Sequence, residues 1–161
     1  MSGAVTISRH ELHEPEVRAL IAALDAEIIE RYPEDRTADH FRLDPDEVAP
    51  GRGAFLVARS ADGAAIGCGA VRLLEPGIAE IKRMFVVRER RGRGAGGLIL
   101  AALESEARRL GAVRLLLETG PRQPEAIALY ARSGFVGTDA FGEYQASPLS
   151  RFMEKILARE A

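Results

Sequence analysis

The segment with the clearest chemical potential is Arg90-Arg-Gly-Arg-Gly-Ala-Gly-Gly97, which combines glycines with arginines. Glycine allows the backbone to approach a ligand closely and leaves its N–H groups accessible. The apolar residues around it predict that it joins a strand over 78–87 to a helix that starts near Leu98. A helix N-terminus carries partial positive charge, and arginine adds charge-assisted hydrogen bonds. The segment therefore predicts an anion site suited to a pyrophosphate.

A dinucleotide-binding turn is one alternative interpretation. Gly92, Gly94 and Gly97 fit the pattern Gly-x-Gly-x-x-Gly, and Glu118 ends the next apolar strand as a ribose-binding acid would. However, the first glycine does not follow the strand directly, and hairpins precede it where parallel strands are expected. Only residues 119–161 follow Glu118, too few for a second nucleotide-binding half and a catalytic domain.

A tight turn without any ligand is the other alternative. Four glycines and four arginines stand within ten consecutive residues here, and this density favours the anion site over a plain turn.

Two carboxylates stand in or at the end of apolar strands, Glu80 and Glu118. A buried carboxylate is costly and usually has a partner or a chemical task, so both are candidates for a general base. The structural alternatives are a salt bridge from Glu80 to Lys82 or an arginine, and a solvated strand end for Glu118. A strand period of two places Glu80, Lys82 and Met84 on one face.

The surrounding elements follow from apolar periodicity and turn residues. Strands are expected at 4–8, 55–59, 65–74, 78–87 and 113–117, with two closing strands near 135–136 and 152–153. Helices are expected from Pro15 to near Pro33, from Leu98 to Leu110, and over 124–132. The polar stretch 34–52 gives no firm element.

The long helix between two apolar strands implies a parallel pair joined by a crossover, and Asp62-Gly63 and Glu75-Pro-Gly77 indicate hairpins. We therefore expect a mixed α/β fold. Its sheet is mostly antiparallel with one parallel central pair, and helices cover both faces. A length of 161 residues with 47% apolar content predicts a single domain over 1–161.

Composition excludes several classes of function. A net charge of −2 does not suit nucleic acid as the main partner, and no apolar run approaches the length of a membrane span. No secretory signal is visible, and the single cysteine fits a cytoplasmic protein. His10, His13 and His40 lack metal-site spacing, so no metal is expected. The oligomeric state cannot be read from the sequence, and a homodimer is compatible with it.

Two motifs resemble the GNAT superfamily of N-acetyltransferases. The run Glu80-Ile-Lys-Arg-Met-Phe-Val-Val-Arg-Glu-Arg-Arg-Gly-Arg-Gly-Ala-Gly96 is similar to its acetyl-coenzyme A signature, Arg/Gln-x-x-Gly-x-Gly/Ala, through Arg91, Gly94 and Gly96. The run Gln123-Pro-Glu-Ala-Ile-Ala-Leu-Tyr-Ala-Arg-Ser-Gly-Phe135 resembles the family's second motif, with glutamine where many members carry asparagine. The resemblance covers roughly residues 53–157. The tail from Phe141 resembles a bacterial branch whose acceptors are mostly unassigned.

The resemblance implies an enzyme that moves an acetyl group from acetyl-coenzyme A to a primary amine of a small molecule or peptide. An alkylamine is mostly protonated at neutral pH, so a base must remove a proton. The resemblance places the oxyanion donor at the Val86 N–H and the leaving-group acid at Tyr130. Tyr130 could instead pack into the core. The residues that it implies for the cofactor are Met84, Phe85, Val86, Arg91, Gly92, Arg93, Gly94, Ala95, Gly96, Gly97, Gln123 and Tyr130.

For the base, Glu80 aligns with the base of the histone acetyltransferase branch, and Glu118 aligns with that of the ribosomal-protein N-terminal branch. The resemblance narrowly favours Glu80, acting through water. Geometry argues partly against it, because six residues of strand separate Glu80 from Val86, about 20 Å. The alternative function is a non-catalytic acyl-coenzyme A-binding module. Cys68 is expected to be a small core residue rather than a nucleophile.

Overall fold

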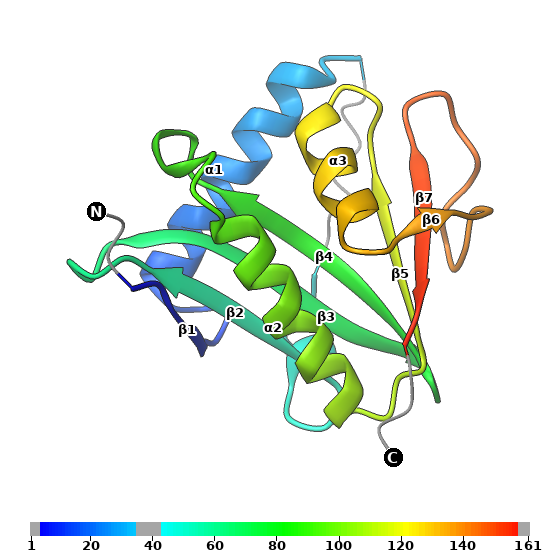
Figure 1. The fold of residues 1–161 in the computed structure, drawn as a ribbon, viewed down its shortest axis with the longest axis horizontal. Coiled ribbons are helices and arrows are strands. Elements are labelled where there is room, and N and C mark those ends of the chain that lie inside the picture. Colours follow the sequence, from blue (N-terminus) through cyan, green and yellow to red (C-terminus); the bar gives the residue numbers. More distant parts are fainter. Residues whose placement is uncertain (1–3, 35–42, 158–161) are drawn as a thin grey trace.

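The computed structural model describes residues 4–34 and 43–157. Within these residues the chain forms one seven-stranded sheet with helices packed on both of its faces (Figure 1). The strands are β1 (Thr6–Arg9), β2 (Gly53–Arg59), β3 (Ala65–Glu75), β4 (Ile78–Val86), β5 (Arg114–Thr119), β6 (Val136–Gly137) and β7 (Arg151–Ile156). The α-helices are α1 (Pro15–Arg31), α2 (Ala95–Arg109) and α3 (Pro124–Arg132), and the 3-10 helices are η2 (Pro45–Val48) and η3 (Arg88–Arg90).

The strand order is β1-β2-β3-β4-β5-β7-β6, and all neighbours are antiparallel except the central pair β4 and β5. The predicted mixed α/β fold with one parallel pair is therefore confirmed. The predicted elements are present with shifts of up to three residues, the largest being the start of α2 at Ala95 and the end of β7 at Ile156. In the stretch 34–52, η2 forms behind a capping box at Asp44, while residues 35–42 lie outside the described residues.

Apolar residues at helical spacing divide the helices between the two faces. On α1, the buried residues Val17, Leu20, Leu24 and Ile28 recur every three or four positions and pack against one face of the sheet. On the opposite face, α2 contributes residues such as Ile99 and Leu103, and α3 joins the same cluster. None of the described helices is long and apolar enough to cross a membrane.

The parallel pair β4 and β5 holds together over only part of its length. The register pairs Ile78 with Arg114 and ends at Ile81 with Leu117, although β4 continues to Val86 and β5 to Thr119. Figure 1 shows the two strands side by side at one end and separated toward the other. A gap therefore opens in the middle of the sheet, at the C-terminal ends of both strands.

A β-bulge in β4 begins at Arg83, two residues after Ile81, the last residue that is paired with β5. Cys68 faces Phe85 and Ala70 faces Lys82, so two residues of β4 oppose one residue of β3. Arg83, within the bulge, has a φ of 58°, which a residue with a Cβ adopts at a cost. A bulge bends its strand and increases the local twist, which turns β4 away from β5.

The bulge corrects one expectation about side-chain direction. Glu80 and Lys82 do share a face, but Met84 packs into the cluster on the α2 side. Arg83 instead points to the face of the sheet that α1 covers, where its Nη1 lies 2.6 Å from Oδ1 of Asp25. The extra residue breaks the period of two, so Met84 does not lie on the face of Glu80 as the alternation predicts.

The core around α2 provides a stability test. Leu103 is 0% exposed and Leu98, on the same helix, is 50% exposed. Leu103→Ala should lower the free energy of unfolding by about 2–5 kcal/mol, because it removes buried contacts and leaves a cavity. Leu98→Ala should change it by less than about 0.5 kcal/mol. Urea unfolding measures both, and equal losses would contradict this assignment of the core.

Candidate active site

The glycine-rich segment forms the loop that leads from β4 through η3 into α2. Gly92 and Gly94 have φ values of 78° and 86°, in the left-handed region that favours glycine. Gly94 is the N-cap of α2, so the N–H groups of the first helical turn, starting at Ala95, have no partner within the helix. This loop presents backbone donors and the positive end of a helix dipole at one point.

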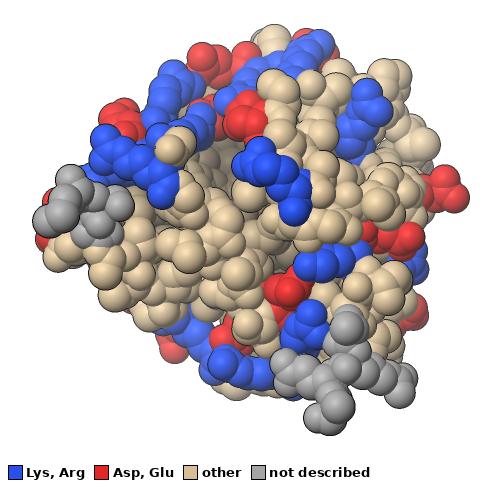
Figure 2. All heavy atoms as spheres, in the orientation of Figure 1, with Lys and Arg blue, Asp and Glu red and all other residues tan. Residues whose placement is uncertain are grey.

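A groove of about 460 Å³ runs from this loop between β4 and α3. Its volume is in the range of small-molecule sites. The Cβ of any larger residue at Gly96 would lie 3.1 Å from Cδ2 of Leu129, so glycine keeps the loop close to α3. Figure 2 shows the surface hollowed between the loop and α3, with Lys or Arg atoms on both rims.

Most residues that the sequence assigns to the cofactor line this groove. Arg93 is the exception, since it is exposed and outside the lining. The sequence reasoning missed Leu24 and Glu27 of α1, Arg90, and several residues on α3. The predicted residues that do line the groove are Met84, Phe85, Val86, Arg91, Gly92, Gly94, Ala95, Gly96, Gly97, Gln123 and Tyr130.

The Arg91 side chain is committed to contacts within the protein. Its Nε donates to the carbonyl of Val86 at 2.8 Å, and its Nη2 lies 2.8 Å from Oε2 of Glu27. Its guanidinium also stacks over the ring of Phe85, 5.6 Å from the centroid. Arg91 therefore fixes the loop against β4 and α1, and the loop's backbone, more than this side chain, is presented to a ligand.

Glu27 anchors this arrangement from α1. Its carboxylate lies within ion-pair distance of Arg31, Arg88 and Arg91, at 3.7, 3.2 and 2.8 Å. Burial alone would raise the pKa of Glu27, but hydrogen bonds from Arg91 and then Arg88 lower it below its ordinary value. The carboxylate is thus ionised at neutral pH and holds α1 to the loop.

The backbone of Val86 is oriented toward the gap in the sheet. The N–H of Val87 donates to the carbonyl of Ile66, so the adjacent pair Gly67 and Val86 is a non-hydrogen-bonded pair of the ladder. In such a pair the N–H and C=O groups point away from the partner strand. The Val86 N–H therefore faces the side of β4 that β5 has left.

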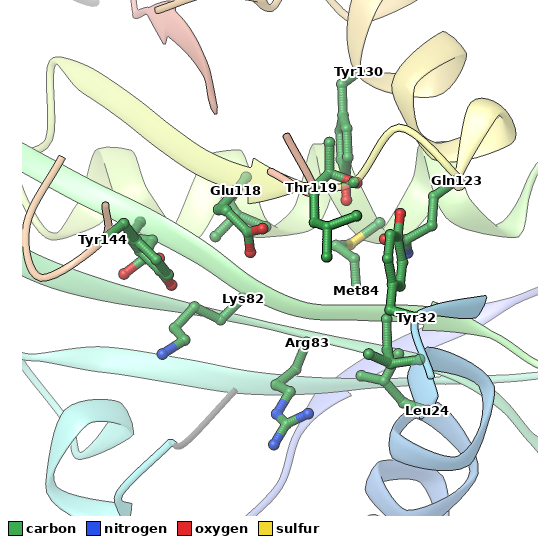
Figure 3. A pocket seen from close by; sticks show the side chains of 15 residues that line it. Leu24, Tyr32, Lys82, Arg83, Met84, Glu118, Thr119, Gln123, Tyr130 and Tyr144 are labelled. Atoms are coloured by element: carbon green, nitrogen blue, oxygen red, sulfur yellow. The ribbon is translucent and has the colours of Figure 1, made fainter. Parts of the chain in front are cut away.

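A second, smaller pocket of about 80 Å³ lies on the other side of this gap. Its lining combines apolar side chains of α1 with Glu80, Lys82 and Arg83 of β4, Glu118 and Thr119 of β5, and Tyr144 (Figure 3). Four residues line both this pocket and the groove: Leu24, Met84, Gln123 and Tyr130. The two cavities therefore meet at these residues.

Tyr130 lies at the junction of the two cavities. It is almost completely buried, and its ring packs edge-on against Phe135 at 5.9 Å. Burial first, and then the charge of Glu118, raise the pKa of Tyr130 above its ordinary value of 10. The phenol is therefore protonated throughout the neutral range. Tyr130 both packs in the core and lines the two cavities.

Glu80 is 0% exposed, and both of its oxygens have partners. Oε1 accepts from Arg72 Nε at 3.0 Å, and Oε2 accepts from the Tyr144 hydroxyl at 2.6 Å. Arg72 also pairs with Glu47. This is the structural alternative for Glu80, a salt bridge to an arginine, and it places a protein donor at each carboxylate oxygen.

Glu118 has a different environment. It is partly exposed, lines the small pocket, and lies one residue before the buried Thr119 at the end of β5. Its charge contributes to the raised pKa values of Tyr130 and Tyr144. Figure 3 shows its carboxylate directed into the pocket, on the side of the gap that faces β4.

The end of α1 is fastened to the loop between β5 and α3. Arg31 Nη1 donates to the Arg122 carbonyl at 2.9 Å, and Arg122 Nη1 donates to the Arg31 carbonyl at 2.8 Å. The Tyr32 hydroxyl accepts from the Arg122 N–H at 2.9 Å. A Cβ at Gly120 would lie 1.9 Å from that hydroxyl, so glycine is required beside the pocket wall.

Tyr32 and Tyr144 are two aromatic pocket residues that sequence reasoning did not identify. Tyr144 belongs to the tail segment whose resemblance to one bacterial branch was noted, which is the one signal that pointed to it. Tyr32 directly precedes Pro33, where the helix was expected to end, and carried no signal of its own.

Cys68, His10 and His13 are outside the lining of these cavities. Cys68 is 0% exposed, and its thiol donates to the Arg83 carbonyl at 3.4 Å, within the bulge. His10 contacts Glu14 and His13 contacts Glu11, while His40 lies outside the described residues. Among residues 4–34 and 43–157, no three His, Cys, Asp or Glu side chains gather into a metal-binding group.

Burial raises the pKa of the Cys68 thiol to about 12. At pH 8.5 the folded protein should react with iodoacetamide at least ~100-fold more slowly than the urea-unfolded protein, because an unfolded cysteine is about half thiolate at that pH. Mass spectrometry of the alkylated protein measures both rates. Fast, stoichiometric alkylation of the folded chain would contradict this burial and reopen a nucleophilic role.

Known proteins are similar to this chain in sequence, and solved structures are similar to it in fold. An IAA acetyltransferase from Azospirillum brasilense is 43% identical over 154 residues, covering 95% of this chain and 98% of the relative. A solved protein from Klebsiella pneumoniae, provisionally assigned as an acyl-CoA N-acyltransferase, is 42% identical with a TM-score of 0.82, covering 96% and 98%. A GNAT family acetyltransferase from Elizabethkingia anophelis, solved with acetyl-CoA bound, has a TM-score of 0.66 at 20% identity, covering 95% and 98%, and shows likeness of fold.

The acetyltransferase (GNAT) family model matches residues 17–135, which run from α1 through the glycine-rich loop to Phe135, three residues after the end of α3. This span includes both motifs and the junction of the two cavities, and the chain belongs to the GNAT acetyltransferase family.

Proposed function

We propose that this protein transfers the acetyl group of acetyl-coenzyme A to a primary amine. The observation that carries the proposal is the meeting of two cavities at Met84, Gln123 and Tyr130. The larger one begins at a phosphate-type loop, and the smaller one holds ionisable side chains. A donor that enters along one and an acceptor that enters by the other would meet in the gap between β4 and β5.

The groups along the groove follow the same order as the parts of acetyl-coenzyme A that they would bind. Backbone N–H groups at Gly94 to Gly97 would take the pyrophosphate. The pantetheine arm would lie along Met84 to Val86, in place of the strand that β5 no longer supplies. Gln123, at the N-cap of α3, would hydrogen-bond that arm. The thioester would then reach Tyr130. Two solved structures of similar fold, one with acetyl-CoA and one with coenzyme A bound, support this choice of donor.

The transfer itself requires one bond to form and one to break. The neutral amine nitrogen attacks the thioester carbon, the carbonyl becomes an oxyanion, and the carbon–sulfur bond then breaks. The Val86 N–H would stabilise the oxyanion, since it points into the gap. Tyr130, protonated at neutral pH, would donate to the departing sulfur.

We propose Glu118 as the group that receives the amine proton, directly or through water. Glu118 is partly exposed in the acceptor pocket, whereas Glu80 is fully buried and bonded to Arg72 and Tyr144. The sequence resemblance narrowly favours Glu80, and the greater exposure of Glu118 in the pocket supports Glu118.

A non-catalytic acyl-coenzyme A-binding module is the second candidate, because the groove alone would suffice for binding. Release of free coenzyme A above the background rate, in the presence of an amine, separates an enzyme from such a module.

Cofactor binding is tested by thermal unfolding. At a hundredfold excess over Kd, acetyl-CoA should raise Tm by about 5–10 °C. Gly94→Glu should abolish the shift, because it places bulk and negative charge in the loop. The matched control is Gly111→Glu, at the other end of α2, where glycine also has a positive φ with open space around it. If folded Gly94→Glu keeps the full shift, the proposed phosphate site is wrong.

The base is tested by two carboxamide variants. Glu118→Gln should lower kcat by about 10²-fold or more and remove the ascending limb of the rate against pH. Glu80→Gln should keep that limb but cost roughly 3 kcal/mol of stability, because Arg72 loses a buried charged partner. Rates are measured with one acceptor on variants shown to be folded. Loss of the limb in Glu80→Gln alone would give the role to Glu80.

A further inference from the structure

We infer that the acceptor is a small amine that also carries a carboxylate, of the size of a free amino acid, and that Lys82 binds the carboxylate. The inference rests on the proposed acetyl transfer and names the class of acceptor. It excludes long peptides and simple alkylamines as the preferred substrates.

The first observation is the placement of charge on the pocket wall. The bulge in β4 turns the consecutive residues Lys82 and Arg83 toward the same side, where both line the pocket. Arg83 is held by Asp25 at 2.6 Å. Lys82 is partly buried, and Figure 3 shows it along the wall that faces Glu118 and Tyr144.

The second observation is that a carboxylate, of charge opposite to that of Lys82, also lines the pocket. Glu80 is 0% exposed, whereas Glu118 is partly exposed and lines the pocket, so Glu118 is the carboxylate that would meet an incoming amine. An acceptor with an amine at one end and a carboxylate at the other presents opposite charges to Glu118 and Lys82. An amine without a carboxylate would interact with Glu118 but would leave Lys82 without an anionic ligand.

The third observation is the cost of keeping Lys82 in this wall. Burial lowers the pKa of Lys82, although the nearby Glu80 acts in the opposite direction. An ammonium group that has lost water gains more from an anionic ligand than a fully hydrated one does. A bound carboxylate would therefore stabilise the charged form of Lys82.

The fourth observation is size. The pocket volume of about 80 Å³ has room for roughly six water molecules. The heavy atoms of a small amino acid need a space of this order. Its other walls include the aromatic rings of Tyr32 and Tyr144 and the apolar side chains Leu24, Ile28 and Leu149, which suit a short side chain. A peptide chain would place its carboxylate far from Lys82.

The test compares acids with their amides. The twenty common L-amino acids, β-alanine and 4-aminobutyrate are screened with acetyl-CoA for release of free coenzyme A. Each amino acid that proves to be a substrate is then compared with its own amide, which keeps the amine and the size but lacks the negative charge. The wild type should prefer the acid by about tenfold to a hundredfold in kcat/KM, the range of a charge-assisted hydrogen bond.

Lys82→Met should reduce this preference toward one by lowering kcat/KM for the acid alone, and Lys82→Arg should keep most of it. The acid and its amide differ in amine basicity, and comparing the acid-to-amide ratio of each variant with that of the wild type cancels this difference. Lys155→Met is the matched control, because Lys155 pairs with Glu104 and lies outside the pocket lining. It should leave the ratio unchanged.

The inference is overturned if the amides react as well as the acids, if Lys82→Met leaves the ratio unchanged, or if no acid is acetylated. The thermal shift with acetyl-CoA is measured on the same samples. A retained shift would mean that only the acceptor class is wrong, and a missing shift would mean that the proposed acetyl transfer itself fails.

Discussion

The pairing of β4 with β5 ends at Ile81 and Leu117, and the candidate site depends on this limit. Beyond that point the backbone of β4 loses a neighbour that a central strand would normally have. A ligand able to hydrogen-bond along an extended strand can take that place. The bulge at Arg83 and Met84 begins two residues after Ile81, so the same local irregularity that bends the strand also opens the site.

Ion pairs between elements keep this opening in a fixed shape. Glu27 joins α1 to the glycine-rich loop through Arg91, and Asp25 joins α1 to the bulge through Arg83. Glu80 is fixed in the same way by partners on β3 and in the tail. A buried carboxylate therefore has two physical explanations, a structural partner or a chemical task, and only the identity and distance of its neighbours decide between them.

The fold and the loop could be predicted from the sequence because their signals are local. Apolar periodicity marked each helix, and glycines at left-handed positions marked the loop. The face of Met84 could not be predicted, since a bulge adds one residue without a sequence signature here. The partners of Glu80 also escaped prediction, because Arg72 and Tyr144 come from distant segments that only the folded sheet and tail bring together. Tyr32 escaped for the same reason, as its contacts lie about ninety residues away in the chain.

Two cavities that meet at one point imply that donor and acceptor are bound together when the acetyl group moves. This central claim is tested most directly by initial rates measured over a matrix of acetyl-CoA and acceptor concentrations. Direct transfer in a ternary complex predicts double-reciprocal lines that intersect. Parallel lines, with an acetylated enzyme detected by mass spectrometry when acetyl-CoA is supplied alone, would mean a covalent intermediate and would contradict the account.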